Sequence, residues 1–349
     1  MSDTRQHYQR AIPMKFSVRF NNDLSAKRFT HLAALAEEAG FDQIWVSNDL
    51  FWHSATVLVA AAARVTSRIA LGVGVFNPVT MHAAEIAMVA TSLQEVSDGR
   101  FNLGLGAGAD QFLSWARLAA DPPLRRTERA IREVRALLTG SAPDGWQPEG
   151  RLRTGSVAVP IYVGAMAPRM LHLAGRLADG ALPLLFPPAH YRLAAAQIAE
   201  GSRQASRDPQ SLDVAACIWC SVDLDPARAR RALAAKIAYY GASFSPYLLA
   251  RASLMPADFE PIQRALSGRD PERATDLVTP AMLSLGVAGD IDDVSEACAS
   301  LIAAGARHIS FGPPLGPDPE RALMALGASV LPAVKAAQQV DEASGPISP

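Results

Sequence analysis

Strand-like and helix-like patterns alternate eight times along this chain, and no other feature of the sequence constrains its fold as strongly. The first unit pairs an apolar strand over 16–20 with an amphipathic helix over 25–39, which Gly40 ends. Eight strands that alternate with helices predict a closed (β/α)8 barrel, the TIM barrel, while counting alone leaves open a doubly wound sheet.

The expected elements follow this pattern to the end of the chain. The strands are expected at 16–20, 43–46, 69–75, 101–105, 161–163, 180–184, 212–222 and 308–311. The helices are expected at 25–39, 55–65, 83–96, 126–138, 169–178, 190–206, 291–304 and 319–337.

The barrel pattern predicts one domain over 14–338, between an N-terminal tail at 1–13 and a C-terminal tail at 339–349. Two insertions interrupt the pattern. Residues 140–160, rich in Pro and Gly, predict a loop or hairpin before the fifth strand. The larger insertion, at 225–279 after strand 7, reads as mainly helical. It would lie over the catalytic face as a substrate lid, or else cover a barrel flank or form a dimer contact.

Composition narrows the class of partner. Of 349 residues, 49% are hydrophobic, and 33 Lys and Arg balance 34 Asp and Glu, which disfavours nucleic acid and anionic membranes as partners. The chain contains neither a membrane-spanning apolar run nor a secretory segment, so it is expected in the cytoplasm. Its three cysteines predict free thiols in a reducing compartment.

The active site of a TIM barrel lies where the strands end at their carboxyl side. The third strand carries Gly72 and Gly74 there and runs into an Asn77-Pro78 turn, which suggests that a flat ring approaches the backbone. Gly106 lies in a glycine run after the fourth strand that can face an anion or a ring edge, or simply make a turn.

The segment that follows the fifth strand is the better candidate for holding phosphate. Gly164, Ala165 and Met166 lead into a helix near Arg169, whose free N–H groups and positive dipole end would face an anion. The alternative is an ordinary strand-to-helix turn.

Several motifs follow one another over roughly residues 14–338, at 72–80, 98–108, 160–165, 170–175, 178–180, 277–282 and 312–317. In this order they resemble the luciferase-like monooxygenase superfamily, and within it the methylenetetrahydromethanopterin reductase group. The resemblance implies a TIM barrel that binds coenzyme F420, an 8-hydroxy-5-deazaflavin that carries hydride on C5. It also implies a small organic substrate, such as a pterin, and a homo-oligomer, a dimer or tetramer.

The resemblance also assigns roles to residues. It implies a non-proline cis peptide bond at Gly74-Val75, which forms a bulge behind the middle ring of the coenzyme. The ring would lie against Gly72 to Asn77, with Asn77 and Thr80 lining its pocket. The backbone around Gly164, Ala165 and Met166 would hold the phosphate-bearing tail.

Two departures from the family pattern fall where proton chemistry would occur. The Asp-His pair that typically follows strand two is replaced here by Asn48-Asp49, and the acidic residue after the fourth-strand glycines is displaced, with Ala109 followed by Asp110. Asp49, Asp110 or His53 would then donate the proton, if burial raised a carboxyl pKa. The plainer alternatives are solvated or capping carboxylates and a loop imidazole beside Trp52.

Three functions remain open on this basis. The first is hydride transfer with the deazaflavin, the second is an FMN-dependent monooxygenase, and the third is a catalytically weakened paralogue that binds a coenzyme without turnover. No metal site is expected, because Cys217 and Cys220 lie three apart in one strand and face opposite sides. Arg228, Arg230, Arg231 and Lys236 read as a solvated face of the insertion, which an anionic substrate tail could also meet.

Overall fold

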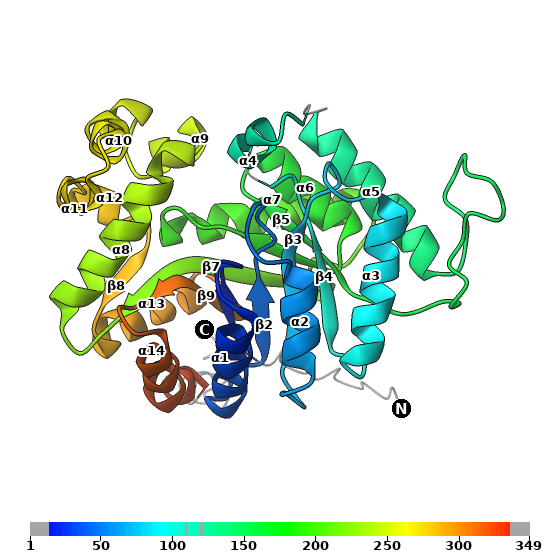
Figure 1. Ribbon diagram of the computed structural model, residues 1–349, viewed down its shortest axis with the longest axis horizontal. Coiled ribbons are helices and arrows are strands. Elements are labelled where there is room, and N and C mark those ends of the chain that lie inside the picture. The colour runs from blue at the N-terminus through cyan, green and yellow to red at the C-terminus, as the bar shows by residue number, and fades with distance from the viewer. Residues whose placement is uncertain (1–13, 109, 119–121, 336–349) are drawn as a thin grey trace, which may run out of the picture.

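The computed structural model describes residues 14–108, 110–118 and 122–335, and at its centre the strands form a closed parallel barrel (Figure 1). Around the ring the strands follow the order β1, β2, β3, β4, β5, β6, β7 and β9, and β9 pairs back to β1. The TIM barrel predicted from the sequence is confirmed.

The strands within the described residues are β1 (Lys15–Phe20), β2 (Gln43–Val46), β3 (Ala70–Phe76), β4 (Phe101–Leu105), β5 (Ile161–Ala165), β6 (Gly180–Pro183), β7 (Asp213–Val222), β8 (Val287–Gly289) and β9 (His308–Leu315). We call the end where these strands finish the mouth of the barrel, and the opposite end its base.

The helices outside the barrel are α1 (Ala26–Glu38), α2 (Ala55–Ala63), α3 (Ala83–Val96), α4 (Asp110–Trp115), α5 (Pro123–Leu138), α6 (Pro168–Leu177), α7 (Tyr191–Gln204), α13 (Ile291–Ala303) and α14 (Pro319–Ala325). Capping residues fix several of their starts. Ser25 accepts a hydrogen bond from the backbone of Arg28 at the start of α1, and Asp290 makes a capping box at the start of α13.

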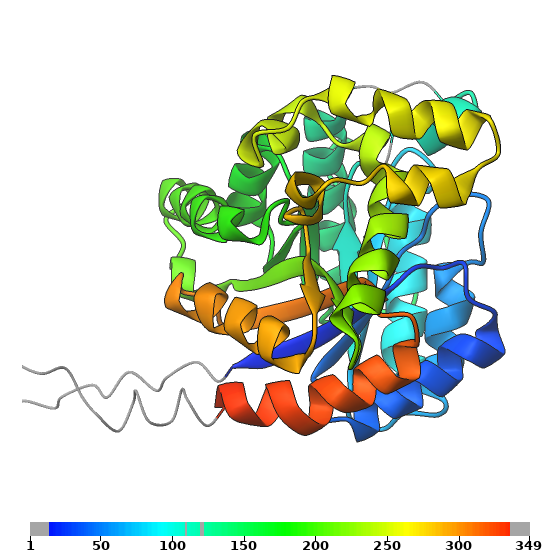
Figure 2. The same cartoon turned by 90° about the vertical axis from the view of Figure 1, so that its left-hand side faces the viewer.

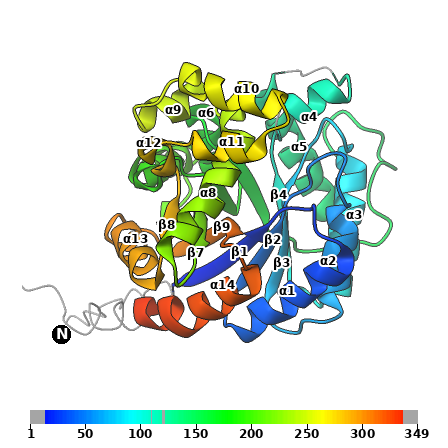
Figure 3. The ribbon, with the colours of Figure 1, turned by 60° about the vertical axis from the view of Figure 1, so that its left-hand side comes forward.

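The insertion after β7 is mainly helical, as the sequence predicts, and is the largest in the barrel. It comprises α8 (Pro226–Tyr240), α9 (Pro246–Arg251), α10 (Glu260–Ser267), α11 (Pro271–Asp276) and α12 (Pro280–Leu283). Figures 2 and 3 show these yellow helices over the mouth, close to α4. Ser243 of the insertion donates a hydrogen bond to Gln111 of α4 at 3.0 Å, which links the two segments.

Side-chain alternation along the strands sorts the residues into two layers. On β1, Phe16, Val18 and Phe20 are buried in the apolar layer between strands and helices, while Ser17 and Arg19 face the barrel interior. The same alternation on β7 puts Cys217 inside and Cys220 outside, and both are free thiols. The sequence-based expectation that these two cysteines face opposite sides is confirmed.

Three features differ from the sequence-based elements. Helix α4 and strand β8 are not among the expected elements; β8 pairs with the last residues of β7, from Cys220 opposite Val287 to Val222 opposite Gly289. The final helix is interrupted by a π-helical segment over Leu326–Val330. The expected tails, Ala109 and the last residues of the expected final helix lie outside the described residues. Within the described part of the chain, no helix is both long and apolar enough to cross a membrane.

Candidate functional site

The third strand bends at the mouth, where the Gly74-Val75 peptide bond is cis. The pairing of β3 with β4 shifts register between Val73 and Phe76 at this point. The cis bond and the bulge that the family resemblance implies are therefore confirmed in β3.

The side chain of Val75 rests on two glycines from neighbouring strands. A Cβ at Gly106 would lie 2.9 Å from Val75 Cγ2, and a Cβ at Gly164 would lie 2.9 Å from Val75 Cγ1. Neither strand end can therefore carry a side chain unless Val75 moves. We call these three residues, Val75, Gly106 and Gly164, the Val75 platform; it lies in the part of the mouth where the sequence predicts a flat ring.

The other glycines at this side of the barrel are closely packed, and the predicted contacts of Gly72 and Gly74 with the coenzyme ring remain a prediction. A Cβ at Gly72 would lie 2.3 Å from the Trp45 ring, so the space beside Gly72 is filled by that indole in the barrel interior. A Cβ at Gly104 would lie 2.2 Å from the carbonyl oxygen of Val73, which shows how closely β4 approaches the bulge. Gly74 lies between Trp45 and Leu182.

Asn77 joins the end of β3 to the loop after β4. Its amide donates to the carbonyl oxygen of Ala107 at 2.6 Å and accepts from the backbone of Val79 at 2.8 Å. Thr80 donates to the carbonyl oxygen of Asn77 at 3.1 Å. The Thr80 side chain therefore bonds within its own loop, whereas Asn77 also bridges to the loop after β4, and their predicted place in the ring pocket remains a prediction.

The turn between β5 and α6 supplies backbone donors. Ala165 is buried, whereas Met166 is exposed. Helix α6 begins after Ala167, which makes no side-chain cap hydrogen bond. The first N–H groups of α6 are thus not covered by a capping side chain, in keeping with the predicted phosphate role of this turn.

The loop after β2 is held by one amide. Asn22, buried at the end of β1, donates to the carbonyl oxygens of Asp49 and His53 at 2.9 Å and 2.7 Å. The same side chain accepts, through its amide oxygen, from the Ser47 hydroxyl and the Asp49 backbone. Asn48, which departs from the family pattern, accepts from the first residue of α2 at 3.2 Å and so stabilises the start of that helix.

The three predicted proton donors differ in their surroundings. Asp49 is half-buried, and desolvation raises the pKa of its carboxyl, against a hydrogen bond to Ser47 and the charge of Lys236, which lower it. His53 is exposed, with its backbone held by Asn22. Asp110 begins α4, and its side chain lies outside the described part of the structure. Burial therefore favours the protonated form of the Asp49 carboxyl.

A buried cation that the sequence analysis did not single out faces the mouth from β1. Arg19 donates from Nη2 to the carbonyl oxygen of Ile218 on β7 at 2.6 Å, and its buried Nε has no hydrogen-bond partner among the described residues. The guanidinium passes over β9 at Gly312, where a Cβ would lie 2.2 Å from Nη2. Burial lowers the pKa of Arg19.

Lys236 of α8 lies beside this cation. Its ammonium is 3.3 Å from the amide oxygen of Asn21 and 4.1 Å from the centre of the Tyr240 ring. Desolvation and the nearby Arg19 charge lower its pKa to about 8, although Asp23 and Asp49 act in the opposite direction. The expectation of a solvated face holds for Arg228, Arg230 and Arg231, but it is wrong for Lys236, which turns inward because it shares a helix face with Leu233 and Tyr240.

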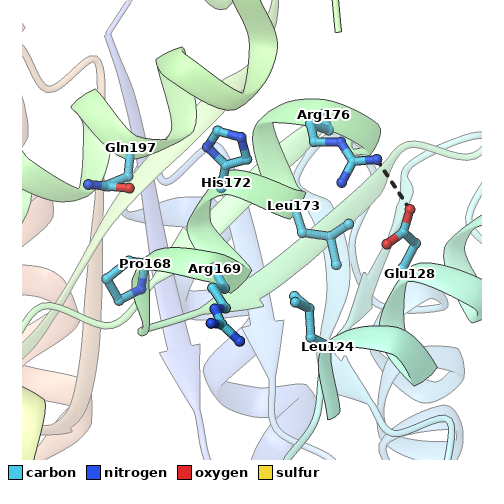
Figure 4. Close-up of a pocket in the computed structure, with 8 residues that line it drawn as sticks. All are labelled: Leu124, Glu128, Pro168, Arg169, His172, Leu173, Arg176 and Gln197. Atoms are coloured by element: carbon cyan, nitrogen blue, oxygen red, sulfur yellow. Dashed lines mark hydrogen bonds and ion pairs between the residues drawn. The ribbon is translucent and has the colours of Figure 1, made fainter. Parts of the chain in front are cut away.

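A separate groove of about 320 Å³ lies outside the barrel between α5, α6 and α7 (Figure 4). Its lining includes Arg169, His172 and Arg176 of α6, and Arg176 forms an ion pair with Glu128 at 3.3 Å. The predicted site residues whose side chains are described are not among those that line this groove.

The geometry defines a TIM-barrel protein with a candidate site at the strand ends, as comparison with known proteins also indicates. The family model described as luciferase-like monooxygenase matches residues 8–308, and the chain belongs to this family. It is 32% identical over 325 residues to 5,10-methylenetetrahydromethanopterin reductase of Methanolobus tindarius, covering 91% of this chain and 100% of that protein. It is 28% identical to F420-dependent glucose-6-phosphate dehydrogenase of Nakamurella multipartita, covering 91% of this chain and 97% of that protein.

A solved structure agrees with this assignment. The coenzyme F420-dependent tetrahydromethanopterin reductase of Methanopyrus kandleri superposes with a TM-score of 0.84 at 27% sequence identity, covering 92% of this chain and 99% of that one. The similarity therefore extends over the whole barrel.

Proposed function

We propose that this protein is an oxidoreductase that uses coenzyme F420 to transfer a hydride between C5 of the deazaflavin and an electrophilic carbon of a small organic substrate. Relatives named as F420-dependent enzymes support the coenzyme, and those named as methylenetetrahydromethanopterin reductases support a pterin-like substrate. The observation that carries the proposal is the Val75 platform at the mouth of the barrel.

The residues at the mouth fit a flat tricyclic ring. The cis peptide bond presents Val75 at the mouth, and Gly106 and Gly164 leave the backbone of β4 and β5 without side chains there. The uncapped start of α6, beside Gly164, Ala165 and Met166, would hold the phosphate of the coenzyme tail. When bound, the deazaflavin supplies the hydride chemistry at C5, and the protein positions it.

Asp49 is the residue we assign to proton transfer. Its raised pKa keeps a larger fraction of the carboxyl protonated near neutral pH than an exposed aspartate would have. Asn22 fixes the backbone on which Asp49 stands. His53 and Asp110 remain the alternative donors.

Spectroscopic titration tests the coenzyme. The purified protein is titrated separately with coenzyme F420 and with FMN, and bound ligand is measured by absorbance and fluorescence. We expect saturable binding of F420 and none of FMN. Binding of FMN alone would instead favour the second function, a monooxygenase of the kind that gives the family its description.

A turnover assay distinguishes an active enzyme from the third function, a catalytically weakened paralogue that binds the coenzyme. Oxidation of reduced F420 is followed at its visible absorbance with a methylene-bearing reduced pterin as hydride acceptor. Binding of F420 without turnover of this or any other tested acceptor would indicate the weakened paralogue.

We also propose a homo-oligomer and a cytoplasmic location. Exposed apolar side chains on α2 and α3, such as Val57 and Met88, support an association surface, and the buried free cysteines support a reducing compartment. Sedimentation equilibrium tests the first; a monomer at micromolar concentration would refute it. Fractionation of the source cells tests the second.

A further inference from the structure

The guanidinium of Arg19 is a half-buried cation, and it lacks an anionic partner within the described residues. A guanidinium has five N–H donors, and Arg19 makes a single hydrogen bond to the rest of the described structure, to the Ile218 carbonyl. No carboxylate in the described part of the chain forms an ion pair with it. A buried charge without a partner is costly to fold around, so a site that keeps one generally presents it to a ligand.

Lys236 brings a second positive charge to the same place. Its ammonium lies 4.1 Å from the centre of the Tyr240 ring and 5.6 Å from the centre of the Trp219 ring, and it forms no ion pair within the described residues. Neither of the two nearby acids forms an ion pair with these cations in the described structure, although their charges act to raise the pKa of Lys236. Asp23 is exposed, and Asp49 is half-buried.

The two cations lie across the barrel from the Val75 platform. Arg19 is on β1 and bonds to β7, and Lys236 is on the helix that follows β7. The platform is built from β3, β4 and β5, which are on the opposite side of the ring of strands. A substrate that reacts with a ring on the platform would therefore have its far side next to Arg19 and Lys236.

We infer that Arg19 and Lys236 form a subsite for a carboxylate carried by the substrate, on the side of the mouth that faces the coenzyme platform. This inference rests on the proposed function and sharpens it, because it restricts the substrate to organic acids. A carboxylate suits the pair because a planar guanidinium can donate to both of its oxygens, while an ammonium adds a charge from any direction. The aromatic rings of Trp219 and Tyr240 beside Lys236 would accept an apolar or aromatic part of the same molecule.

The test measures binding of small acids to the full-length protein by titration calorimetry at fixed ionic strength, which holds charge screening constant. The probes are formate, acetate and benzoate, with benzamide as the neutral match for benzoate and inorganic phosphate as a different anion. We expect at least one of the carboxylates to bind, and benzamide to bind at least about tenfold more weakly than benzoate.

Substitution assigns the binding to the two cations. In Arg19→Met and in Lys236→Met, carboxylate affinity should fall about tenfold or more, since each removes a charge-assisted hydrogen bond. Arg19→Lys keeps the charge but loses the planar fork, and its affinity should fall between those of the parent protein and Arg19→Met. Arg153→Met removes an exposed charge in the loop before β5, and should leave the affinity unchanged.

The outcomes are distinct. Any of four results would overturn the subsite: none of the three carboxylates binds, benzoate and benzamide bind equally, phosphate alone binds, or the affinity is unchanged in both Met variants. If circular dichroism shows that Arg19→Met does not fold, the affinities of Lys236→Met and Arg19→Lys decide between these outcomes. Repeating the titration with F420 present separates the proposed function from the carboxylate subsite. Carboxylate binding without F420 binding would contradict the proposed function but still support the subsite.

Discussion

The base and the mouth of this barrel both contain charged groups removed from water; within the described residues, Asp213 at the base forms ion pairs, whereas Arg19 and Lys236 at the mouth form none. At the base, Asp213 accepts from Lys15 at 2.9 Å, from the Tyr162 hydroxyl at 2.8 Å and from His308 at 2.9 Å. Burial alone would raise the pKa of Asp213, but His308 and Lys15 hold that pKa well below its usual range. His308 also contacts the Ser17 hydroxyl at 2.8 Å.

At the mouth, Arg19 and Lys236 have one hydrogen bond each and no ion pair in the described part of the chain. The two ends therefore use charge in different ways. A satisfied network stabilises the barrel, whereas charges left without partners at the strand ends are available to a ligand. Substitutions at each end and a change of pH test this contrast.

The largest effect is expected at the base. Asp213→Ala should lower the free energy of unfolding by about 3–5 kcal/mol, because it leaves Lys15, His308 and Tyr162 without their shared acceptor. Urea denaturation measures the loss, with Asp144→Ala, at an exposed position in the loop before β5, as the control. A loss below about 1 kcal/mol would mean that the base network does not stabilise the fold.

The next effect is on catalysis at the mouth. Asp49→Asn should reduce kcat about 100-fold or more while leaving the urea midpoint near that of the parent protein, because the amide cannot donate the carboxyl proton. Single-turnover kinetics with reduced F420 measures it. Equal kcat values would transfer the role to His53 or Asp110.

Substituting one glycine at each end of the barrel compares coenzyme binding at the mouth with stability at the base. Gly164→Ala should weaken F420 binding about tenfold, since its Cβ would displace Val75. Val75→Ala in the same chain should restore part of the affinity, as a double-mutant cycle would show. Gly180→Ala, whose Cβ would lie 2.1 Å from the Tyr162 ring, should instead cost stability. Unchanged F420 binding in Gly164→Ala, together with weaker F420 binding in Gly180→Ala, would contradict the assignment of the Val75 platform to the coenzyme.

The pH dependence of carboxylate binding is expected to be a few-fold effect. Lys236 is charged below its pKa of about 8, so affinity should be full below that pH and fall above it. The groups that face Lys236 are the carboxylates of Asp23 and Asp49, the guanidinium of Arg19 and the hydroxyl of Tyr240. The guanidinium keeps its charge, and burial raises the pKa of Tyr240, so we assign the change in affinity near pH 8 to Lys236. Lys236→Met should flatten the profile measured by calorimetry from about pH 7 to about 9.5.

The lowered pKa of Lys236 has the opposite effect on folding stability: carboxylate affinity falls as the pH rises, whereas the contribution of Lys236 to stability rises. The pKa of Lys236 is lower in the folded protein than its ordinary value of 10.5, so the unfolded chain binds the proton more tightly between about pH 8 and 10.5. Its contribution to folding stability should therefore rise with pH across that window. Urea midpoints of the parent protein and Lys236→Met would check the sign.

The smallest effect is expected for the stability of Arg19→Met. Removing an unpaired buried cation should change the free energy of unfolding by about 1 kcal/mol or less, in either direction, because the lost Ile218 hydrogen bond is offset by relief of desolvation. A loss of unfolding free energy as large as that of Asp213→Ala, in the same denaturation experiment, would show that Arg19 stabilises the fold. The base and the mouth would then not differ in this respect.

The barrel and its strand ends could be predicted from the sequence, because parallel strands buried on both faces and amphipathic helices leave strong patterns. The place of Arg19 could be predicted only in part. Its alternation with Val18 and Phe20 points it inward, but its path depends on Gly312, which lies far along the chain.

Lys236 left a weaker signal. Its spacing from Leu233 and Tyr240 places it on the buried face of α8, although its neighbours Arg230 and Arg231 suggest a solvated one. Helix α4 could not be predicted, because six residues between two loops give no clear periodicity. The pairing of Asn22 with the loop after β2 depends on three segments meeting in space, which no local pattern reveals.

The pairing of β8 with the end of β7 has a consequence for how this protein can be altered. Because Val222 and Gly289 are partners in the sheet, the long excursion between them leaves and re-enters the barrel at adjacent points. We therefore expect that the whole stretch, Lys236 included, can be exchanged for that of a related barrel without interrupting the ring of strands. Chimaeras built at these two joints should keep the coenzyme and change the acid that is accepted.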